Sequence, residues 1–280
     1  MKALFLLSTL LLIFAMAPAA QAQRCTNSQF KGVYGAIAKG EFISTPNIPS
    51  GPTTRIGRVT PDGRGHSHIE ATTSLNGIVL SEEYDGTYNI HPDCTADVIL
   101  NIPFPGVPQP IPFTFKGVVS DNFNQMDIFL VSPAGSTVGL TLRQQSGGES
   151  YGRSSEGHGC SLRDLNRGYA LDLRGTVGNP LSSDSFHVLG RLDFDGRGTF
   201  AGSASFSTAG NIQSPVPLVG TYTMDRSCKF TMTLAGNGWV FSGMLIDGGD
   251  GAVLIHSGPT VPYNGFNVVG SVLSGTLKQQ

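Results

Sequence analysis

The sequence contains one pattern twice, in the same order, and this duplication limits the possible folds more than any other feature. Each copy has a Gly-Arg pair, an Asp-Gly turn, a Gly-Thr-Tyr segment, a cysteine and a Phe-x-Gly segment. The offset between matched positions stays between 126 residues, from Phe115 to Phe241, and 135 residues, from Cys25 to Cys160. The matched segments are 57–65 and 190–198, 86–88 and 220–222, 115–117 and 241–243, and 142–145 and 277–280. We therefore predict a duplicated domain.

Residues 146–159 separate the two copies. They are rich in Gly and Ser and almost without apolar side chains, a composition typical of flexible linkers. The predicted domains are therefore residues 25–145 and 160–280. Each of these segments is long enough for one modest domain.

The first residues of the chain are typical of a secretory signal peptide. Lys2 precedes an apolar run, and Ala20-Gln21-Ala22 forms a small-residue cleavage motif, so we expect residues 1–22 to be removed. No later run is long and apolar enough to predict a membrane span. We predict a secreted or periplasmic protein.

The four cysteines, Cys25, Cys94, Cys160 and Cys228, are spaced alike in both copies. Their separations are 69 residues in the first copy and 68 in the second. Disulfides form in the compartments that a signal peptide reaches. Four cysteines allow three pairings, and this spacing favours Cys25–Cys94 and Cys160–Cys228. A zinc site is disfavoured because no two cysteines are close in sequence.

Inside each copy, apolar and polar residues alternate with a period of two, which is typical of β-strands. Residues 199–206 and 230–234 show this alternation most clearly. Asp62 and Asp195 each precede a Gly, and Asp-Gly pairs favour hairpin turns. About eight such strands in each copy would close into a barrel without exposed edges. We predict an all-β protein of two tandem antiparallel β-barrels, with two-sheet β-sandwiches as the alternative.

The repeated pattern resembles small secreted bacterial β-barrel domains of the lipocalin and allene-oxide-cyclase types. The resemblance rests on the early tyrosine, the Asp-Gly-x-Gly turn, the Gly-Thr-Tyr segment before a cysteine and the Phe-x-Gly strand, and it covers both copies. It implies a calycin-like barrel fold. It implies no catalytic residues, because none here matches a known catalytic site. The early Gly-x-Trp signature of lipocalins is absent, and the single tryptophan, Trp239, lies late in the second copy.

Composition and motifs narrow the classes of function. Only 14% of the residues are charged and the net charge is −2, so the chain has no basic field for nucleic acid or anionic lipid. No catalytic or cofactor-binding motif is present, and the oligomeric state is left open. We expect a non-catalytic binding or cell-envelope module whose partner is a small apolar ligand in a barrel cavity, or another envelope component. The alternative is a cyclase- or isomerase-type enzyme that acts on an apolar substrate in the barrel.

Aromatic residues are the candidate ligand-binding side chains. Tyr34, Tyr88, Tyr169 and Tyr222 occupy matched positions in the two copies, while Trp239 occurs in the second copy alone. These residues either line a ligand cavity with their polar groups turned inward or fill the barrel cores.

His66, His68 and Glu70 form the sharpest local cluster of polar residues. On a strand, residues two apart share a face, and two imidazoles with a carboxylate are ligands for zinc or copper. The other interpretation is a solvated strand face beside the Asp62 turn. The second copy has no His or Glu at the matched positions, so such a site would not belong to the shared unit.

Two proline-rich segments, 43–52 and 102–112, are predicted to be long loops at a barrel mouth, where loops often carry binding. Comparing the two copies also helps to separate residues that maintain the fold from residues that form a functional site. Features present in both copies are expected to be scaffold. Features present in one copy are where a functional site is expected.

Overall fold

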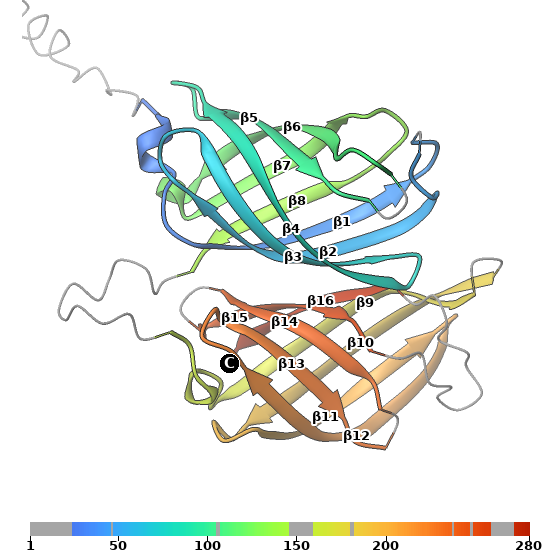
Figure 1. Cartoon of the computed structure of the whole chain (residues 1–280). Coiled ribbons are helices and arrows are strands. Elements are labelled where there is room, and N and C mark those ends of the chain that lie inside the picture. The colour runs from blue at the N-terminus through green and yellow to red at the C-terminus, as the bar shows by residue number, and fades with distance from the viewer. Residues whose placement is uncertain are drawn as a thin grey trace, which may run out of the picture.

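The computed structural model describes residues 24–45, 47–104, 107–145, 159–179, 182–236, 238–246, 249–258 and 272–280. The predicted signal peptide and most of the predicted linker, residues 146–158, lie outside these ranges. The described chain forms two closed antiparallel β-barrels of eight strands each (Figure 1). The prediction of two eight-stranded barrels is confirmed, and the sandwich alternative is wrong. No helix in the described ranges is long and apolar enough to cross a membrane.

In each barrel every strand pairs with the next along the chain, and the last strand pairs with the first. Barrel 1 contains β1 (Tyr34–Phe42), β2 (Gly51–Pro61), β3 (His66–Leu75), β4 (Ile78–Ile90), β5 (Thr95–Ile102), β6 (Ile111–Ser120), β7 (Gln125–Ser132) and β8 (Gly139–Gln144). Barrel 2 contains β9 (Gly168–Asn179), β10 (Ser182–Phe194), β11 (Thr199–Thr208), β12 (Asn211–Met224), β13 (Lys229–Leu234), β14 (Val240–Ile246), β15 (Gly251–His256) and β16 (Val272–Gln279). The described parts of the proline-rich segments lie outside strands except at their ends, which belong to β2, β5 and β6.

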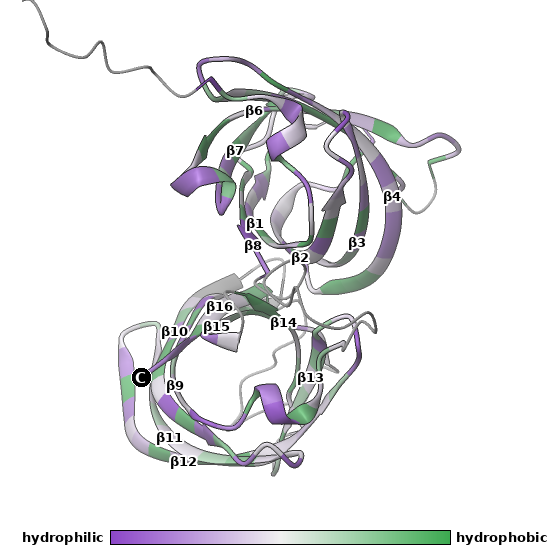
Figure 2. Cartoon of the chain, turned by 90° about the vertical axis from the view of Figure 1, so that its left-hand side faces the viewer, coloured by the Kyte–Doolittle hydropathy of each residue, from purple (hydrophilic) through white to green (hydrophobic). Residues whose placement is uncertain are grey.

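Features that occur in both copies build one end of each barrel, here called the closed end. A short 3-10 helix lies across this end, η2 (Asn27–Gln29) in barrel 1 and η4 (Leu162–Asp164) in barrel 2 (Figure 2). Beside the helices lie the disulfides Cys25–Cys94 and Cys160–Cys228, the pairing that the spacing favours. In the chain-entropy model, closing a loop of this length stabilises a domain by about 4 kcal/mol.

The Asp-Gly turns also lie at the closed ends. Asp195 Oδ1 accepts the backbone N–H groups of Arg197, Gly198 and Thr199 at 2.8–3.0 Å. The Thr199 hydroxyl, which donates to Asp195 Oδ2, and these N–H groups lower the pKa of Asp195 to about 2. Asp62 accepts two backbone N–H groups of its own turn in the same way. The recurrence of this aspartate is therefore explained by turn formation.

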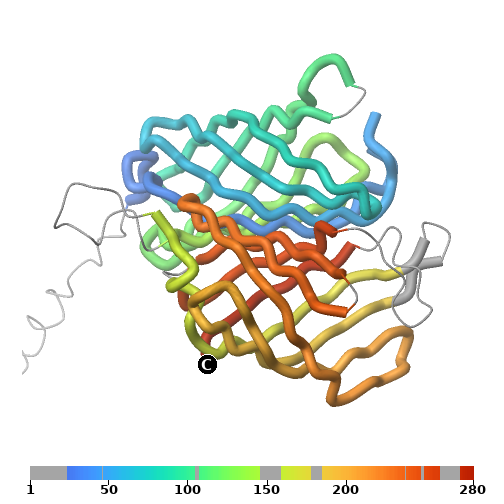
Figure 3. The backbone as a smooth tube through the Cα atoms, turned by 60° about the horizontal axis from the view of Figure 1, so that its bottom comes forward, coloured from blue at the N-terminus to red at the C-terminus, as the bar shows by residue number. Residues whose placement is uncertain are grey.

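The two barrels pack side by side (Figures 1 and 2). The outer faces of β1 and β2 meet β14, β15 and β16, which Figure 3 shows as blue tube against orange and red. Ile56 of β2 belongs to an apolar cluster with Met244, Ile246, Val253 and Ile255 of barrel 2. Because β15 is buried along its whole length, its sequence is a continuous apolar run instead of an alternating one.

Candidate binding site in the lumen of barrel 1

The structure places the four repeated tyrosines at the closed ends, where their hydroxyl groups donate hydrogen bonds to backbone carbonyl oxygens. The bonds are Tyr34 to Phe123 (2.8 Å), Tyr88 to Phe30 (2.9 Å), Tyr169 to Gly249 (2.7 Å) and Tyr222 to Leu165 (2.8 Å). Burial raises the pKa of Tyr88, Tyr169 and Tyr222. These bonds close the barrel ends, and of the four tyrosines Tyr88 also has its ring against the barrel 1 cavity.

Trp239 belongs to the core of barrel 2. Its side chain is 2% exposed, and its ring centroid lies 5.7 Å from those of Phe186 and His256. Burial lowers the pKa of His256 to about 4, so this ring is uncharged at neutral pH. Apolar side chains fill the lumen around Trp239 and leave a cavity of about 10 Å³. The side chains that the structure describes in barrel 2 therefore leave almost no space around Trp239.

The predicted metal-binding residues lie on the outer face of β3, with His66 exposed and His68 and Glu70 half-buried. The His68 ring contacts two carboxylates of β4. Its Nδ1 lies 3.0 Å from Asp85 Oδ1, and its Nε2 lies 3.4 Å from Glu83 Oε1. Among the described residues, no group of three or more His, Cys, Asp or Glu side chains is placed to hold a metal ion. The structure shows a polar strand face here.

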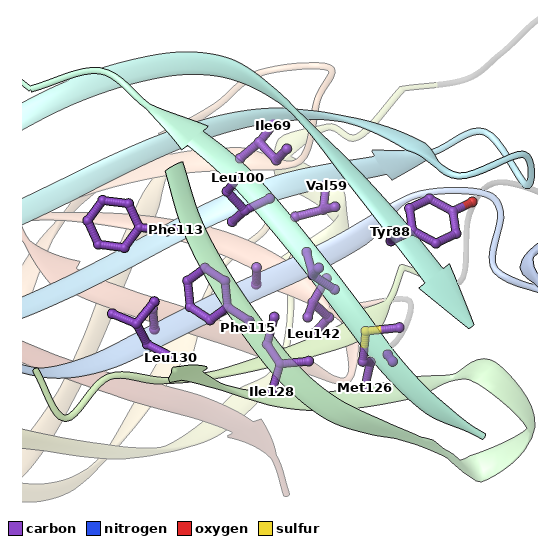
Figure 4. Close-up of a cluster of buried hydrophobic side chains, with 14 of the residues drawn as sticks. Val59, Ile69, Tyr88, Leu100, Phe113, Phe115, Met126, Ile128, Leu130 and Leu142 are labelled. Carbon is purple, nitrogen blue, oxygen red and sulfur yellow. The ribbon is translucent and has the colours of Figure 1, made fainter. Parts of the chain in front are cut away.

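The lumen of barrel 1 contains a cavity of about 60 Å³ with an almost entirely apolar wall. Side chains from several strands point into it (Figure 4). Phe30 and Tyr88 line it at the closed end. At the opposite end, here called the loop end, Phe104 from a proline-rich segment stacks on Phe113 and meets Phe42 edge-on, with ring centroids 5.7 Å and 6.4 Å apart. The lining of this narrow cavity therefore extends along the barrel.

Thr53 and Ser67 also line the cavity, and a connected group of polar side chains lies toward the loop end. It consists of Arg55 of β2, Thr73 of β3 and Tyr84 of β4, which line the cavity, and of Glu82 of β4, which contacts Arg55 and Thr73 without lining the cavity itself. These four residues are here called the lumen cluster. Arg55 donates to Glu82 Oε2 at 2.7 Å from Nη2 and to Thr73 Oγ1 at 2.6 Å from Nε. The Thr73 hydroxyl donates to the same Glu82 oxygen at 2.7 Å. The side chains of Arg55 and Glu82 are 17% and 4% exposed, so this ion pair lies inside the barrel.

Tyr84 completes the lumen cluster. The guanidinium carbon of Arg55 lies 5.6 Å from the centroid of the Tyr84 ring, which is within the range of a cation–π interaction. Burial raises the pKa of Tyr84, and the positive charge of Arg55 opposes this shift only in part. The phenol therefore stays protonated at neutral pH, and the charges of Arg55 and Glu82 balance each other.

Strand register brings the cluster together. Arg55 pairs directly with Thr73 across β2 and β3, and Glu82 lies on β4 opposite the residue two positions before Thr73. The neighbouring Glu83 faces outward and has a side chain that is 73% exposed. Because side chains alternate along a strand, two adjacent glutamates thus meet opposite environments.

Barrel 2 has no polar side chain at the four matched positions. Matched through strand register, the counterparts are Val188 for Arg55, Phe206 for Thr73, Val216 for Glu82 and Leu218 for Tyr84. Three of these four apolar residues line the small residual cavity of barrel 2. The same barrel fold therefore forms with four apolar residues in place of the lumen cluster.

Sequence reasoning missed the lumen cluster, although a signal was present. Arg55 and Glu82 are charged residues at positions where the second copy has valine, so the comparison of the copies marks them as specialised. Their meeting inside the barrel depends on the register of β2, β3 and β4. Alternation along one strand does not supply that register.

No family model and no curated protein matches this chain. Among solved structures, transferrin binding protein B from serogroup B Neisseria meningitidis matches at 9% identity over 90% of this chain and 77% of that chain, with a TM-score of 0.29. A protein of unknown function from the DUF3598 family of Nostoc punctiforme matches at 12% identity over 90% and 97% of the two chains, with a TM-score of 0.28. Rv2717c from M. tuberculosis matches at 13% identity over 94% and 98%, with a TM-score of 0.24. Scores this low carry no argument about family or function.

Proposed function

We propose that this protein is a secreted or periplasmic, non-catalytic binding module. In this proposal the lumen of barrel 1 holds a slender apolar molecule or the apolar end of a larger envelope component. The proposal takes the barrels to be of the lipocalin-like type, in which an eight-stranded barrel holds one small ligand. The two disulfides support a location outside the cytoplasm, where thiols are not kept reduced.

The observation that carries the proposal is the presence of the lumen cluster in barrel 1 alone. Burying an ion pair costs desolvation energy, and apolar replacements of similar volume are often neutral or stabilising. Barrel 2 has such apolar residues at all four positions. The scaffold therefore does not require the cluster, and a role in binding accounts for its presence.

The size of the cavity limits the kind of ligand. Pockets for drug-sized molecules measure about 300–1,000 Å³. The cavity in barrel 1 measures about 60 Å³, which leaves no space for a drug-sized molecule. We expect a short, unbranched apolar chain that lies along the lumen with its polar end at the lumen cluster.

Native mass spectrometry tests the proposal. The fourfold variant Arg55→Val/Thr73→Phe/Glu82→Val/Tyr84→Leu gives barrel 1 the residues that barrel 2 has at the matched positions. We expect wild-type protein recovered from its natural source to carry the mass of a bound small molecule. The fourfold variant, produced in the same source, should carry none.

An exposed ion pair supplies the matched control. Arg191 Nη2 lies 2.9 Å from Asp193 Oδ1 on the surface of barrel 2, where the two side chains are 59% and 57% exposed. The variant Arg191→Gln/Asp193→Asn should keep the bound mass. A wild-type protein without a bound mass, or a fourfold variant that keeps it, would contradict the proposal.

A cyclase- or isomerase-type enzyme is the second candidate. The lumen cluster favours it as well, since Glu82 is a buried carboxylate in contact with Arg55 and Thr73 of the cavity wall, and general acid–base catalysis uses carboxylates. The two candidates differ in the fate of the bound molecule. A binding module releases it unchanged, whereas an enzyme converts it, so chemical analysis of the molecule before and after incubation with the protein distinguishes them.

A further inference from the structure

The contact between the two barrels uses two different outer faces of the repeated unit. Barrel 1 contributes the outer face of its first two strands, β1 and β2, here called face A. Barrel 2 contributes the outer face of its sixth and seventh strands, β14 and β15, here called face B. Because both barrels contain the same strands in the same order, the molecule has a second face A, on β9 and β10, and a second face B, on β6 and β7.

The second face A has an exposed leucine where the first has a buried isoleucine. Leu189 of barrel 2 is the counterpart of Ile56, since each directly precedes the matched Gly-Arg pair. Ile56 is 1% exposed because it packs on barrel 2, whereas Leu189 is 52% exposed. This face continues from the existing contact, because β9 pairs with β16 and residues of β16 meet β2.

The second face B differs from the first in the same way. Val118 and Phe129 of barrel 1 are matched to Met244 and Ile255 of barrel 2 by the Phe-x-Gly segment and strand register. Met244 and Ile255 are fully buried in the cluster with Ile56, whereas Val118 and Phe129 are 47% and 58% exposed. They line an open groove of about 680 Å³ on the outside of barrel 1. Apolar residues that meet a barrel in one copy are thus uncovered in the other.

We propose that molecules of this protein associate head to tail, with the exposed face A of one molecule docked on the exposed face B of the next. Leu189 of one molecule would then lie against Val118 and Phe129 of the other. This contact would repeat the one that already joins two barrels within the chain. Because the two faces differ, each docked pair keeps one free face of each kind, so further molecules can add.

The polar residues of the two faces determine how strong this contact can be. Ion pairs on these faces have both partners in the same molecule, so they need no partner on a second one. They are Arg174–Asp172 and Arg191–Asp193 on face A, and Lys116 of face B with Asp97 of the neighbouring β5, at N–O distances of 2.6–2.9 Å. Ser120 and Asp127 stand where the buried face B has Ile246 and Val253. We therefore expect an association weaker than the contact within the chain, and dependent on concentration.

Sedimentation velocity of the purified chain over a range of concentrations tests the proposal. The weight-average mass of the wild type should rise with concentration. Leu189→Asp and Phe129→Asp each place a charge in the proposed contact and should weaken the association at least about tenfold. Both side chains are more than half exposed, so these variants should keep the fold, which circular dichroism checks. Ile212→Asp is the control, since Ile212 of β12 is apolar, 73% exposed and outside both faces, and it should associate like the wild type.

A mixture of the two variants tests the head-to-tail arrangement. Leu189→Asp leaves face B intact, and Phe129→Asp leaves face A intact. Each variant alone should stay monomeric, while an equimolar mixture should form pairs that contain one molecule of each kind and grow no further. A dimer of either variant alone at the wild-type affinity would indicate a contact between like faces and overturn the proposal.

Two further results would also contradict this association. One is a wild type that stays monomeric up to its highest soluble concentration. The other is an Ile212→Asp variant that loses the association together with Leu189→Asp and Phe129→Asp, because the two faces would then not be responsible. The lumen of barrel 1 takes no part in this contact, so each of these results leaves the proposed function standing.

Discussion

Glu82 and Glu83 are neighbours in the chain, yet their side chains are 4% and 73% exposed. Glu82 takes part in an ion-pair network inside barrel 1, whereas Glu83 lies beside His68 on the outer surface. The difference follows from the alternation of side chains along β4. The role of a charged residue in this fold therefore depends on whether its side chain points into the barrel or outward, more than on its neighbours in the sequence.

His256 in barrel 2 gives a prediction at the scale of a single residue. Its ring packs against Trp239 and Phe241, and burial lowers its pKa from 6.5 to about 4. As the pH falls, the unfolded chain takes up this proton before the folded chain does. We expect the free energy of unfolding to fall by about 3 kcal/mol between about pH 6.5 and about pH 4, and to keep this contribution in full above that range.

Urea unfolding at a series of pH values, followed by the fluorescence of the single tryptophan in barrel 2, measures this fall. The variant His256→Leu has no titrating ring at this position, so its free energy of unfolding should change less over the same pH range. An equal pH dependence in the wild type and the variant would show that His256 is not responsible.

At the scale of secondary structure elements, local patterns predicted strands and turns, and the matching cysteine spacing of the two copies predicted the disulfide pairing. Alternation marks β11 and β13, and the Asp-Gly pairs mark the β2–β3 and β10–β11 turns. The contact between the barrels was not predicted, because it uses the outer faces of β2, β14 and β15. The lumen cluster was not predicted either, since its residues meet only through the register of three strands. Both depend on contacts between elements, which single-strand patterns do not contain.

The contact between the barrels gives a prediction at this scale. Ile56 faces outward from barrel 1, yet it is 1% exposed because it packs against barrel 2. We expect Ile56→Ala to lower the free energy of unfolding by about 2–4 kcal/mol, the usual cost of truncating a buried isoleucine. Ile99 also faces outward but is 41% exposed, so Ile99→Ala is the control and should cost less than about 1 kcal/mol. If urea unfolding shows the same loss of unfolding free energy in Ile56→Ala and Ile99→Ala, the result contradicts this contact.

At the scale of the whole molecule, the duplication separates scaffold from site. The closed ends are alike in the two barrels and carry the 3-10 helices, the disulfides and the tyrosine hydrogen bonds. The lumens differ, with cavities of about 60 Å³ in barrel 1 and about 10 Å³ in barrel 2. Barrel 2 also packs on barrel 1, and Gln145 Nε2 donates a buried hydrogen bond of 2.7 Å to the Leu245 carbonyl across the contact. In our proposal, barrel 2 is a filled structural partner and barrel 1 holds the ligand.

In our proposal the lumen cluster serves binding and not folding. The free energy of unfolding of the ligand-free fourfold variant Arg55→Val/Thr73→Phe/Glu82→Val/Tyr84→Leu, compared with that of the ligand-free wild type, tests this most directly. We predict a folded variant that is as stable as the wild type or more stable by up to about 4 kcal/mol, because a buried ion pair gives way to apolar packing. A variant clearly less stable than the wild type would show that barrel 1 needs the cluster to fold, and would contradict the proposal.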